Sequence, residues 1–537
     1  MKEIAVSENI ENFSDNNYIY VDKTEYIYNL ISQHERVFFS RPRRFGKSLT
    51  INSIGTLFEK GVDPYFKGTW IYKHWQQPLF PVMHLSFLRF STTDIEVFKK
   101  SLFQTLEAYA VRLDIKDYIK SSDPIDFLRN LFMAMPDGMQ IVLLIDEYDC
   151  QLSANINNHD LYDKFRTFFR EFYGVLKGEK HIRFLAVTGV TRLKDISIFS
   201  VGSDIEDLTY DHAFSQMIGF TRDEIKKFYL DYLKIGVANE KKTKPDTVTD
   251  EDIEKLLDRM EEQYDGYCFD SKFRRKVFST LSVNRFLQDL RNYRETSFGD
   301  YWYQSGGVPS ILKNYLESHE IDVEKFLLSD IEINYDAFMN PATLIEMDEN
   351  VLMCQTGYLT LKSEIQSNRK IRLGPANKEV NSALNSLLSG RFFDPDAVAD
   401  FYNDSILKNG SPEEIIKLFN SILATISYEK YPVENESVLR ALIQMYLVGL
   451  RYDVRVEQQN YKGRSDLLVN LDKRRIVIEF KFSKDGSYMD ELLKEAVNQV
   501  QNRQYGTENP EERELIRIAC VFNGAPEVRQ ISLYQVC

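Results

Sequence analysis

Gly46, Lys47 and Ser48 stand in succession, and these residue types in this order could bind the phosphates of a nucleotide. In a loop between a strand and a helix, backbone N–H groups and the helix dipole face an anion. Lys47 would reach the β- and γ-phosphates, and the Ser48 hydroxyl would ligate Mg²⁺. The usual pattern has a glycine six residues before the lysine. Arg41 stands there instead, so the motif is incomplete by itself.

The flanking segments suit such a loop. A short apolar run over 37–39 predicts the strand before it, and residues 47–58 predict the helix after it. The arginines of the loop could clamp phosphate, or at least one of them could form a structural ion pair. The candidate cofactor contacts within this stretch are Arg43, Arg44, Phe45, Gly46, Lys47, Ser48 and Leu49.

A pair of acids, Asp146 and Glu147, ends a run of five apolar residues over 141–145. Such a run is typical of a parallel strand buried on both faces, and ligands of α/β sheets bind at the carboxyl ends of the strands. Asp146 would hold Mg²⁺, and Glu147 would polarise the attacking water. An acidic turn after a buried strand is the alternative, but the combination with the Gly-Lys-Ser sequence favours ATP binding.

Further elements predict the domain around these residues. Residues 81–87 and 183–190 are expected to be core strands, and helical spacing recurs over 94–134 and 160–177. Strands that alternate with helices indicate a parallel, doubly wound α/β sheet. Thr188, near the end of the last strand, could read the γ-phosphate or belong to an ordinary turn.

A second constellation lies near the C-terminus. Residues 475–482 predict a strand in which Glu479 and Lys481 share one face, and Asp466 lies on the neighbouring strand of an expected hairpin. Two carboxylates and the Phe480 carbonyl would suit Mg²⁺, and Lys481 would position a water or stabilise the charge of the transition state. A Glu-x-Lys sequence is also common on ordinary solvated strands.

The composition limits the class of protein. A chain of 537 residues suggests two to four domains, and 43% hydrophobic with 28% charged residues is typical of globular proteins. The net charge of −14 means that nucleic-acid binding would need a local basic groove. The five cysteines show no metal or disulfide spacing, and no apolar run is long enough to span a bilayer. We therefore expect a cytoplasmic protein that is not a membrane protein.

Several motifs resemble the bacterial AAA-ATPase-like proteins with a C-terminal PD-(D/E)XK nuclease domain, in which an arginine-rich loop replaces the glycine-first pattern. The matching segments are 20–24, 41–49, 145–149, 188–190, 219–221, 264–267, Trp302 with Ser305 and Gly306, and 355–360. The Asp466, Glu479 and Lys481 pattern resembles the nuclease motif of this family. The resemblance also implies a helix glutamate, Glu436, and a following helix with Gln499 and Tyr505. Arg440 stands where the family often has histidine.

The resemblance implies an AAA-ATPase-like P-loop domain over 1–235, a helical lid and connector over 236–395, and a nuclease-like domain over 396–537. The predicted function is ATP binding and hydrolysis in a chain fused to a Mg²⁺-dependent nuclease-like domain that acts on nucleic acid, with DNA favoured. Two alternatives stay open: an ATP-gated binding or signalling switch whose nuclease fold does not cut, and a nucleotide-bound scaffold. An arginine supplied by a second copy would imply a homo-oligomer, with Arg192 and Arg170 as candidates.

Overall fold

The computed structural model describes residues 1–116, 118–119, 121–193, 204–292, 298–304, 310–318, 331–340, 343–365, 369–392, 401–426, 428, 432–450, 452–460, 463–471, 473–503 and 513–537. The described residues up to Val380 form one compact unit, and those from Asn381 onwards form a second. Helix α17 (Lys378–Phe392) runs across this division. The domain limits expected at 235 and 395 stay predictions.

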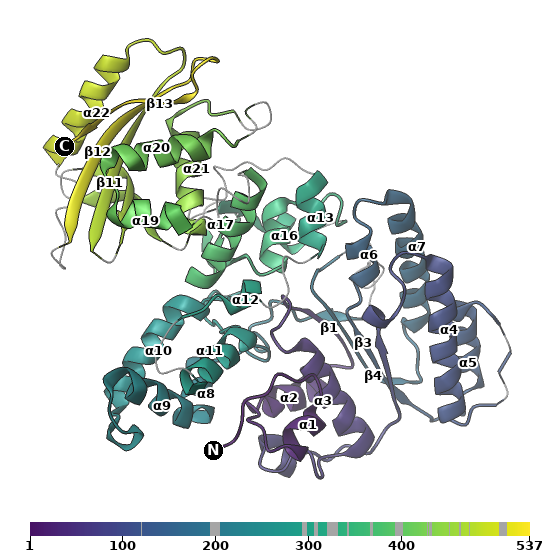
Figure 1. Cartoon of the computed structure of the whole chain (residues 1–537). Helices are drawn as coiled ribbons and strands as arrows, with labels where there is room; N and C mark the ends of the chain where they lie inside the picture. Colours follow the sequence, from purple (N-terminus) through teal and green to yellow (C-terminus); the bar gives the residue numbers. More distant parts are fainter. Residues whose placement is uncertain are drawn as a thin grey trace. The chain divides into compact units, whose positions relative to one another are not determined.

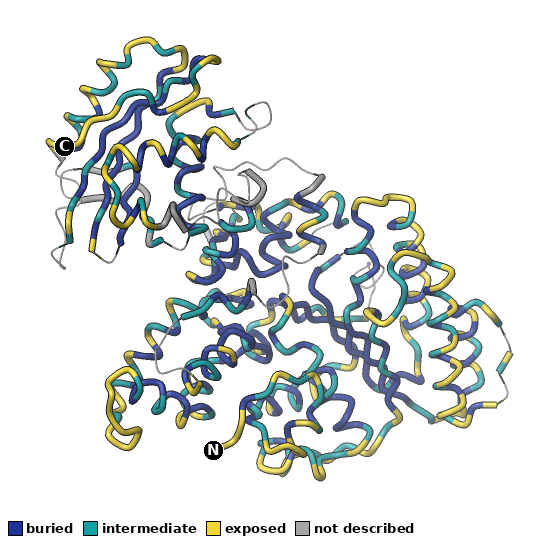
Figure 2. Tube along the Cα trace, in the orientation of Figure 1, coloured by how far each residue is buried: buried dark blue, intermediate teal, exposed yellow. Residues whose placement is uncertain are grey.

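A parallel sheet forms the centre of the first unit. Among the described residues its strand order is β2-β3-β4-β1-β5, and every neighbouring pair is parallel. The three central strands are rich in apolar residues and are buried on both faces. Figure 2 shows these buried strands in dark blue. The strands are β1 (Arg36–Ser40), β2 (Val82–Ser86), β3 (Ile141–Asp146), β4 (Ile182–Gly189) and β5 (Glu206–Asp207).

Helices cover both faces of this sheet (Figure 1). The connection from β1 to β2 runs in one direction across the sheet and the later connections run back, so right-handed crossovers place their helices on opposite faces. The doubly wound fold class is therefore confirmed. The helices are α1 (Ile10–Asp15), α2 (Thr24–Gln33), α3 (Lys47–Lys60), α4 (Ile95–Arg112), α5 (Pro124–Ala134), α6 (Cys150–Ala154) and α7 (His159–Leu176), with 3-10 turns η1 (Trp70–Lys73) and η2 (Phe87–Arg89).

The rest of the first unit is mostly helical, as predicted. Helices α8 to α11 share a hydrophobic core that also takes up Ile4, Ile19 and Val21 from the start of the chain. The elements are α8 (Arg222–Phe228), α9 (Leu230–Lys241), η4 (Pro245–Thr247), α10 (Asp250–Tyr264), α11 (Thr280–Asn292), α12 (Tyr301–Gln304), α13 (Ser310–Ser318), β6 (Ile331–Asn334), α15 (Tyr335–Met339), α16 (Glu349–Gln355), β7 (Leu359–Ile365) and β8 (Lys370–Pro375).

The strands in this region were not predicted. They form a small sheet in the order β6-β8-β7, with both pairs antiparallel. Each described strand has just two alternating buried apolar residues, so the sequence pattern is too short to stand out. These residues are Ile331 and Ile333 on β6, Leu359 and Leu361 on β7, and Ile371 and Leu373 on β8.

The second unit has a mixed sheet in the order β13-β12-β11-β10-β9. Strands β11 and β12 are parallel and the other described pairs are antiparallel. Helices α21 and α22 pack against the sheet, and Leu468, Val477, Ala496, Val500 and Ala519 form a core beneath α22. The elements are α19 (Phe401–Asn409), α20 (Pro412–Leu423), α21 (Glu436–Gly449), β9 (Asp453–Asn460), β10 (Gly463–Asn470), β11 (Arg474–Ser483), α22 (Met489–Arg503), β12 (Glu514–Asn523) and β13 (Gln530–Val536).

None of the described helices combines the length and the apolar character that crossing a membrane would require.

Candidate functional site

The loop between β1 and α3 has the backbone geometry of an anion site. Gly46 precedes α3 with φ 106°, and a Cβ built there would meet no atom within 4 Å. Within the described part of the chain, no side chain caps the first turn of α3, so its N–H groups lack their usual side-chain acceptor. Arg44 also has positive φ, 70°. These features fit a phosphate group at residues 46–49.

Lys47, Ser48 and Asp146 lie together at the carboxyl end of the sheet. Lys47 is buried, and its Nζ donates to the Pro42 carbonyl over 3.2 Å, across the loop. Burial raises the pKa of Asp146, while a hydrogen bond from the Ser48 side chain and the charge of Lys47 oppose that shift. A carboxylate, a hydroxyl and an ammonium in this arrangement fit Mg²⁺ on a phosphate chain.

Glu147 follows Asp146 in the left-handed region, with φ 54°. Its N–H donates to Asp146 Oδ1 over 2.9 Å. A non-glycine residue with this φ costs energy and is held there by its surroundings. Glu147 is half-buried and directly follows Asp146, the last residue of β3.

Thr188 lies deeper than the other candidates. It is fully buried, and its hydroxyl donates to the Phe39 carbonyl of β1 over 2.8 Å. This bond joins two neighbouring strands of the sheet and favours a structural role for the hydroxyl.

The three loop arginines divide into three environments. Arg41 is buried, donates to the carbonyls of Ser40, Thr209 and Phe214 over 2.8, 2.6 and 3.4 Å, and lies over the Phe269 ring. Burial lowers its pKa to about 10. Arg41 is therefore a structural group in contact with backbone carbonyls rather than with phosphate.

Arg44 and Arg43 differ from Arg41. Arg44 donates to the Trp302 carbonyl over 3.0 Å. Arg43 is exposed, and its side chain makes no hydrogen bond or ion pair within the part of the chain that the structure describes. Burial raises the pKa of Cys150 to about 12, and the charge of Arg43 opposes that shift, so Arg43 lies in reach of the end of β3. Arg43 is the loop arginine best placed to meet a phosphate.

Phe45 anchors the loop from the other side. Its ring is buried edge-on against Tyr267, Phe269 and Trp302, with centroids 4.7, 5.5 and 5.8 Å away. These three residues are more than 200 positions away in the sequence. The Phe45 side chain therefore has a packing role in this structure.

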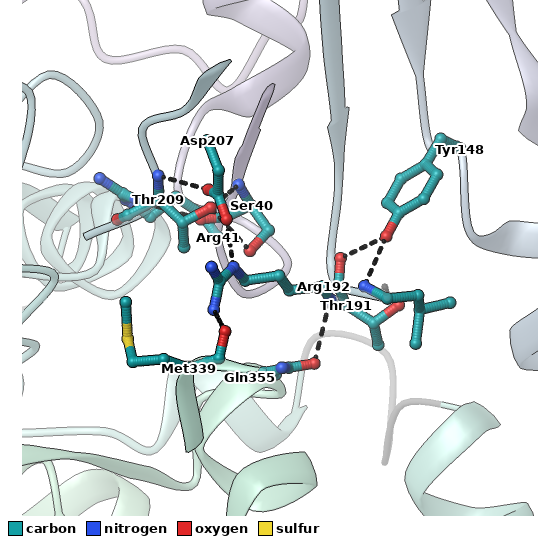
Figure 3. Close-up of polar contacts among 10 residues, drawn as sticks. Ser40, Arg41, Tyr148, Thr191, Arg192, Asp207, Thr209, Met339 and Gln355 are labelled. Carbon is teal, nitrogen blue, oxygen red and sulfur yellow. Dashed lines mark hydrogen bonds and ion pairs between the residues drawn. The ribbon is translucent and has the colours of Figure 1, made fainter. Parts of the chain in front are cut away.

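A second network ties the end of β3 to the segment after β4 (Figure 3). The Tyr148 hydroxyl donates to the Thr191 carbonyl over 3.0 Å and accepts from Leu193 N–H over 3.1 Å. Arg192 pairs with Asp207, donates to the Met339 carbonyl, and its N–H donates to Gln355 over 3.1 Å.

These contacts bear on the two arginines considered as candidates to be supplied to a second copy of the chain. Arg192 is enclosed by its own chain, which disfavours a role in a second copy. Arg170 is exposed on α7.

The second unit brings its four predicted residues together. The register pairs Leu467 with Ile478, so the next residues in line are Asp466 and Glu479. Phe480 N–H donates to Asp466 Oδ2 over 2.8 Å. Lys481 Nζ lies 3.4 Å from Glu436 Oε1 on α21 and 3.9 Å from Glu479 Oε1. The expected meeting of the two carboxylates across the hairpin fits this register.

Glu479 is the most buried acid of this group. Burial and the neighbouring Asp466 raise its pKa to about 8, against the opposing charge of Lys481. Its Oε2 atom is buried and has no hydrogen-bond partner among the residues that the structure describes. A buried carboxylate oxygen that lacks a partner, facing a second carboxylate, fits a divalent cation held by Asp466 and Glu479.

Arg440 enters the same site from α21, one turn after Glu436. Its Nη1 lies 3.8 Å from Asp466 Oδ1. The three acids thus face two cations, Lys481 and Arg440. Among the described residues, no group of three or more His, Cys, Asp and Glu side chains is arranged to hold a metal ion; the predicted ligand set has only two such side chains.

The remaining matched residues are peripheral or not described. Gln499 lies on α22 and donates to Glu495 over 3.3 Å. Tyr505, Ser305 and Gly306 lie outside the described residues.

Two family models match the chain where these sites lie. Residues 4–199 match a family described as predicted AAA-ATPase, and residues 434–530 match the PD-(D/E)XK nuclease superfamily. The chain carries an AAA-ATPase-like region followed by a PD-(D/E)XK nuclease-superfamily region. The predicted resemblance is therefore confirmed.

Two known proteins show distant similarity to the chain. The chain is 26% identical over 482 residues to an uncharacterized protein from the vnfD 5′ region of Azotobacter chroococcum mcd 1, a match that covers 86% of each. The Walker-type ATPase PABY2304 of Pyrococcus abyssi aligns with 12% identity and a TM-score of 0.35, over 71% of this chain and 97% of that one.

Sequence reasoning missed one buried acid near the AAA-ATPase-like site. Glu379, in the first turn of α17, accepts from Trp302 N–H and from the Ser282 hydroxyl, each over 2.8 Å. Burial raises its pKa to about 8, although these hydrogen bonds oppose the shift. Its surrounding sequence has no motif, so only the fold reveals it.

The buried Arg41 gives a stability prediction. Arg41→Ala leaves the buried Ser40 and Thr209 carbonyls without this donor, at about 1–3 kcal/mol each, while the Phe214 carbonyl still accepts from Met217 N–H. The unfolding free energy of the first unit should therefore fall by at least about 2 kcal/mol. Arg43→Ala, at an exposed site of the same loop, should change it by less than about 0.5 kcal/mol. Denaturant unfolding followed by tryptophan fluorescence reports on this unit, because Trp70, Trp75 and Trp302 all lie in it. Equal losses in the two variants would contradict the structural role.

Glu379 predicts a pH dependence. Its pKa is raised from 4.5 to about 8 on folding, so the folded state holds a proton that the unfolded state has lost. The contribution of Glu379 to the free energy of unfolding is therefore fully present below pH 4.5. It is lost as the pH rises towards 8, by at most about 1.4 kcal/mol per pH unit. Glu379→Gln should remove this slope and be more stable than wild type at pH 9. Parallel pH profiles of the two proteins, measured by the same unfolding assay, would refute the raised pKa.

Proposed function

We propose that this protein binds and hydrolyses ATP in its first unit and cleaves nucleic acid, with DNA favoured, in its second. The observation that carries the proposal is the completeness of both sites. Lys47 and Ser48 meet Asp146 with Glu147 beside it, and Asp466 meets Glu479 with Lys481 beside it. A cytoplasmic location and a homo-oligomer stay predictions.

In the first unit, the N–H groups at the start of α3 and Lys47 would bind the phosphates, with Arg43 at their outer side. Ser48 and Asp146 would hold Mg²⁺, which neutralises the charge of the phosphate chain. Glu147, held beside Asp146 by the backbone, would accept a proton from the attacking water. Phe45 and Arg41 would act on the loop's shape rather than on the nucleotide.

In the second unit, Asp466 and Glu479 would hold Mg²⁺, which polarises the phosphodiester and its attacking water. Lys481, 3.9 Å from Glu479, would orient this water and stabilise the developing charge on phosphorus. Glu436 would keep Lys481 in place through the ion pair at 3.4 Å.

One observation favours the non-cleaving alternative. Lys481 and Arg440 already compensate the acids of the second site by ion pairing. Such a site could hold its shape without a metal ion, as a binding or signalling switch gated by ATP would require.

The nucleotide proposal predicts a split between two variants. Lys47→Ala should abolish ATP binding, since it removes the buried charge that faces the phosphates. Glu147→Gln should bind ATP normally and hydrolyse it about 10²–10⁴-fold more slowly, because it loses only the proton acceptor. Titration calorimetry and phosphate release measure the two effects. Unchanged ATP affinity in Lys47→Ala would refute the site.

The nuclease proposal predicts a different split. Asp466→Asn should lose both Mn²⁺ affinity and cleavage. Lys481→Gln should keep Mn²⁺ affinity and lose about 10²–10³-fold in cleavage rate, because it removes charge stabilisation only. Single- and double-stranded DNA and RNA are incubated with each protein, Mg²⁺, and ATP or none. Arg474→Gln, which breaks the pair with Glu514 in the same sheet, is the matched control. Nucleic acid that is bound but never cut by wild type would favour the switch.

A further inference from the structure

Two elements far from the phosphate loop in sequence hold its residues in place. Trp302 on α12 packs its ring on Phe45 at 5.8 Å, and its carbonyl accepts from Arg44 over 3.0 Å. Thr280, the first residue of α11, donates through its hydroxyl to the Arg44 carbonyl over 2.8 Å. Arg44 is thus bound through its side chain by one helix and through its backbone by another.

The fit at this contact is close. Gly357, with φ 91°, lies where a Cβ would come within 2.9 Å of Pro42 and 3.0 Å of the Trp302 ring. Pro42, Trp302 and Gly357 therefore pack without space for another carbon. The shape of the loop depends on where Trp302 lies.

A single carboxyl group joins the two holding elements. Through Oε1, Glu379 accepts from the backbone N–H of Trp302 on α12. Through Oε2, it accepts from the Ser282 hydroxyl on α11, and each hydrogen bond measures 2.8 Å. Ser282 lies two residues after Thr280. Glu379 thereby fixes α11 and α12 to each other at the two points from which they contact Arg44.

We propose that Glu379 is a positioning residue for the nucleotide: through Ser282 and Trp302 it sets the phosphate loop in its binding shape. The proposal rests on ATP binding by the first unit. Because linkage is reciprocal, bound nucleotide stabilises the Trp302–Glu379 contact as much as that contact strengthens nucleotide binding. Glu379 opens α17, the helix that continues into the second unit, so the start of that helix becomes more firmly held when nucleotide binds.

Titration calorimetry of the full chain with Mg²⁺ and a non-hydrolysable ATP analogue tests the proposal at pH 7. Glu379→Ala should weaken binding about tenfold or more, which corresponds to about 1.4 kcal/mol. Glu379→Gln should stay within about twofold of wild type, since its amide oxygen can accept from Trp302 and its NH₂ can donate to Ser282. Asn284→Ala is the matched control: it removes a buried hydrogen bond between the same helix α11 and Tyr229, a residue outside the loop.

A second readout separates positioning from general destabilisation. In Trp70→Phe/Trp75→Phe, Trp302 is the only remaining tryptophan of the chain. The nucleotide analogue should change its emission in this background, and adding Glu379→Ala should remove the change at saturating analogue. Adding Asn284→Ala should leave the change intact.

The outcomes separate the proposal from its basis. If wild type and Lys47→Ala both fail to bind the analogue, ATP binding itself is refuted, and with it the role of Glu379. If wild type binds through Lys47 but Glu379→Ala binds as tightly, only the positioning role is refuted. Equal weakening by Glu379→Ala and Asn284→Ala would also overturn it.

Discussion

The burial of Arg41 and Phe45 is the constraint on which the nucleotide site depends. A phosphate-binding loop usually owes its shape to glycines that allow the backbone to turn. In this chain Arg41 replaces the first glycine and donates to three buried carbonyls. Phe45 inserts between three aromatic rings. The loop is therefore shaped by side chains that reach out of it, and the sheet and the helical region supply their partners.

In the second unit, the site depends on acidic side chains that lie close together at a buried position of the sheet. Asp466 and Glu479 lie in adjacent strands, and a buried carboxylate is costly unless a cation faces it. Lys481 provides one cation, and Arg440 provides a second. Unlike histidine, arginine stays charged near neutral pH, so this site carries a permanent positive charge beside one of its candidate metal ligands.

The sequence predicted those parts of the fold that have strong local patterns. The strand before Asp146 and the helix of Phe165, Phe168 and Phe172 lie as expected because five consecutive apolar residues or a repeated helical spacing leave few alternatives. The meeting of Asp466 and Glu479 could also be predicted, because the short connection of a hairpin restricts its register and alternation places side chains on a common face. Glu379 could not be predicted, because its role depends on contacts 77 and 97 residues away. The structural role of Arg41 is hidden in the same way, since its acceptors belong to a distant segment.

The phosphate loop and the helical region around Trp302 should respond to nucleotide together. Hydrogen exchange of the full chain, measured by mass spectrometry with and without Mg²⁺ and an ATP analogue, tests this response. We expect slower exchange over 41–49 and, to a similar degree, over 264–270 and 298–304, where the partners of Phe45 lie. Slower exchange confined to 41–49 and 141–149 would contradict it.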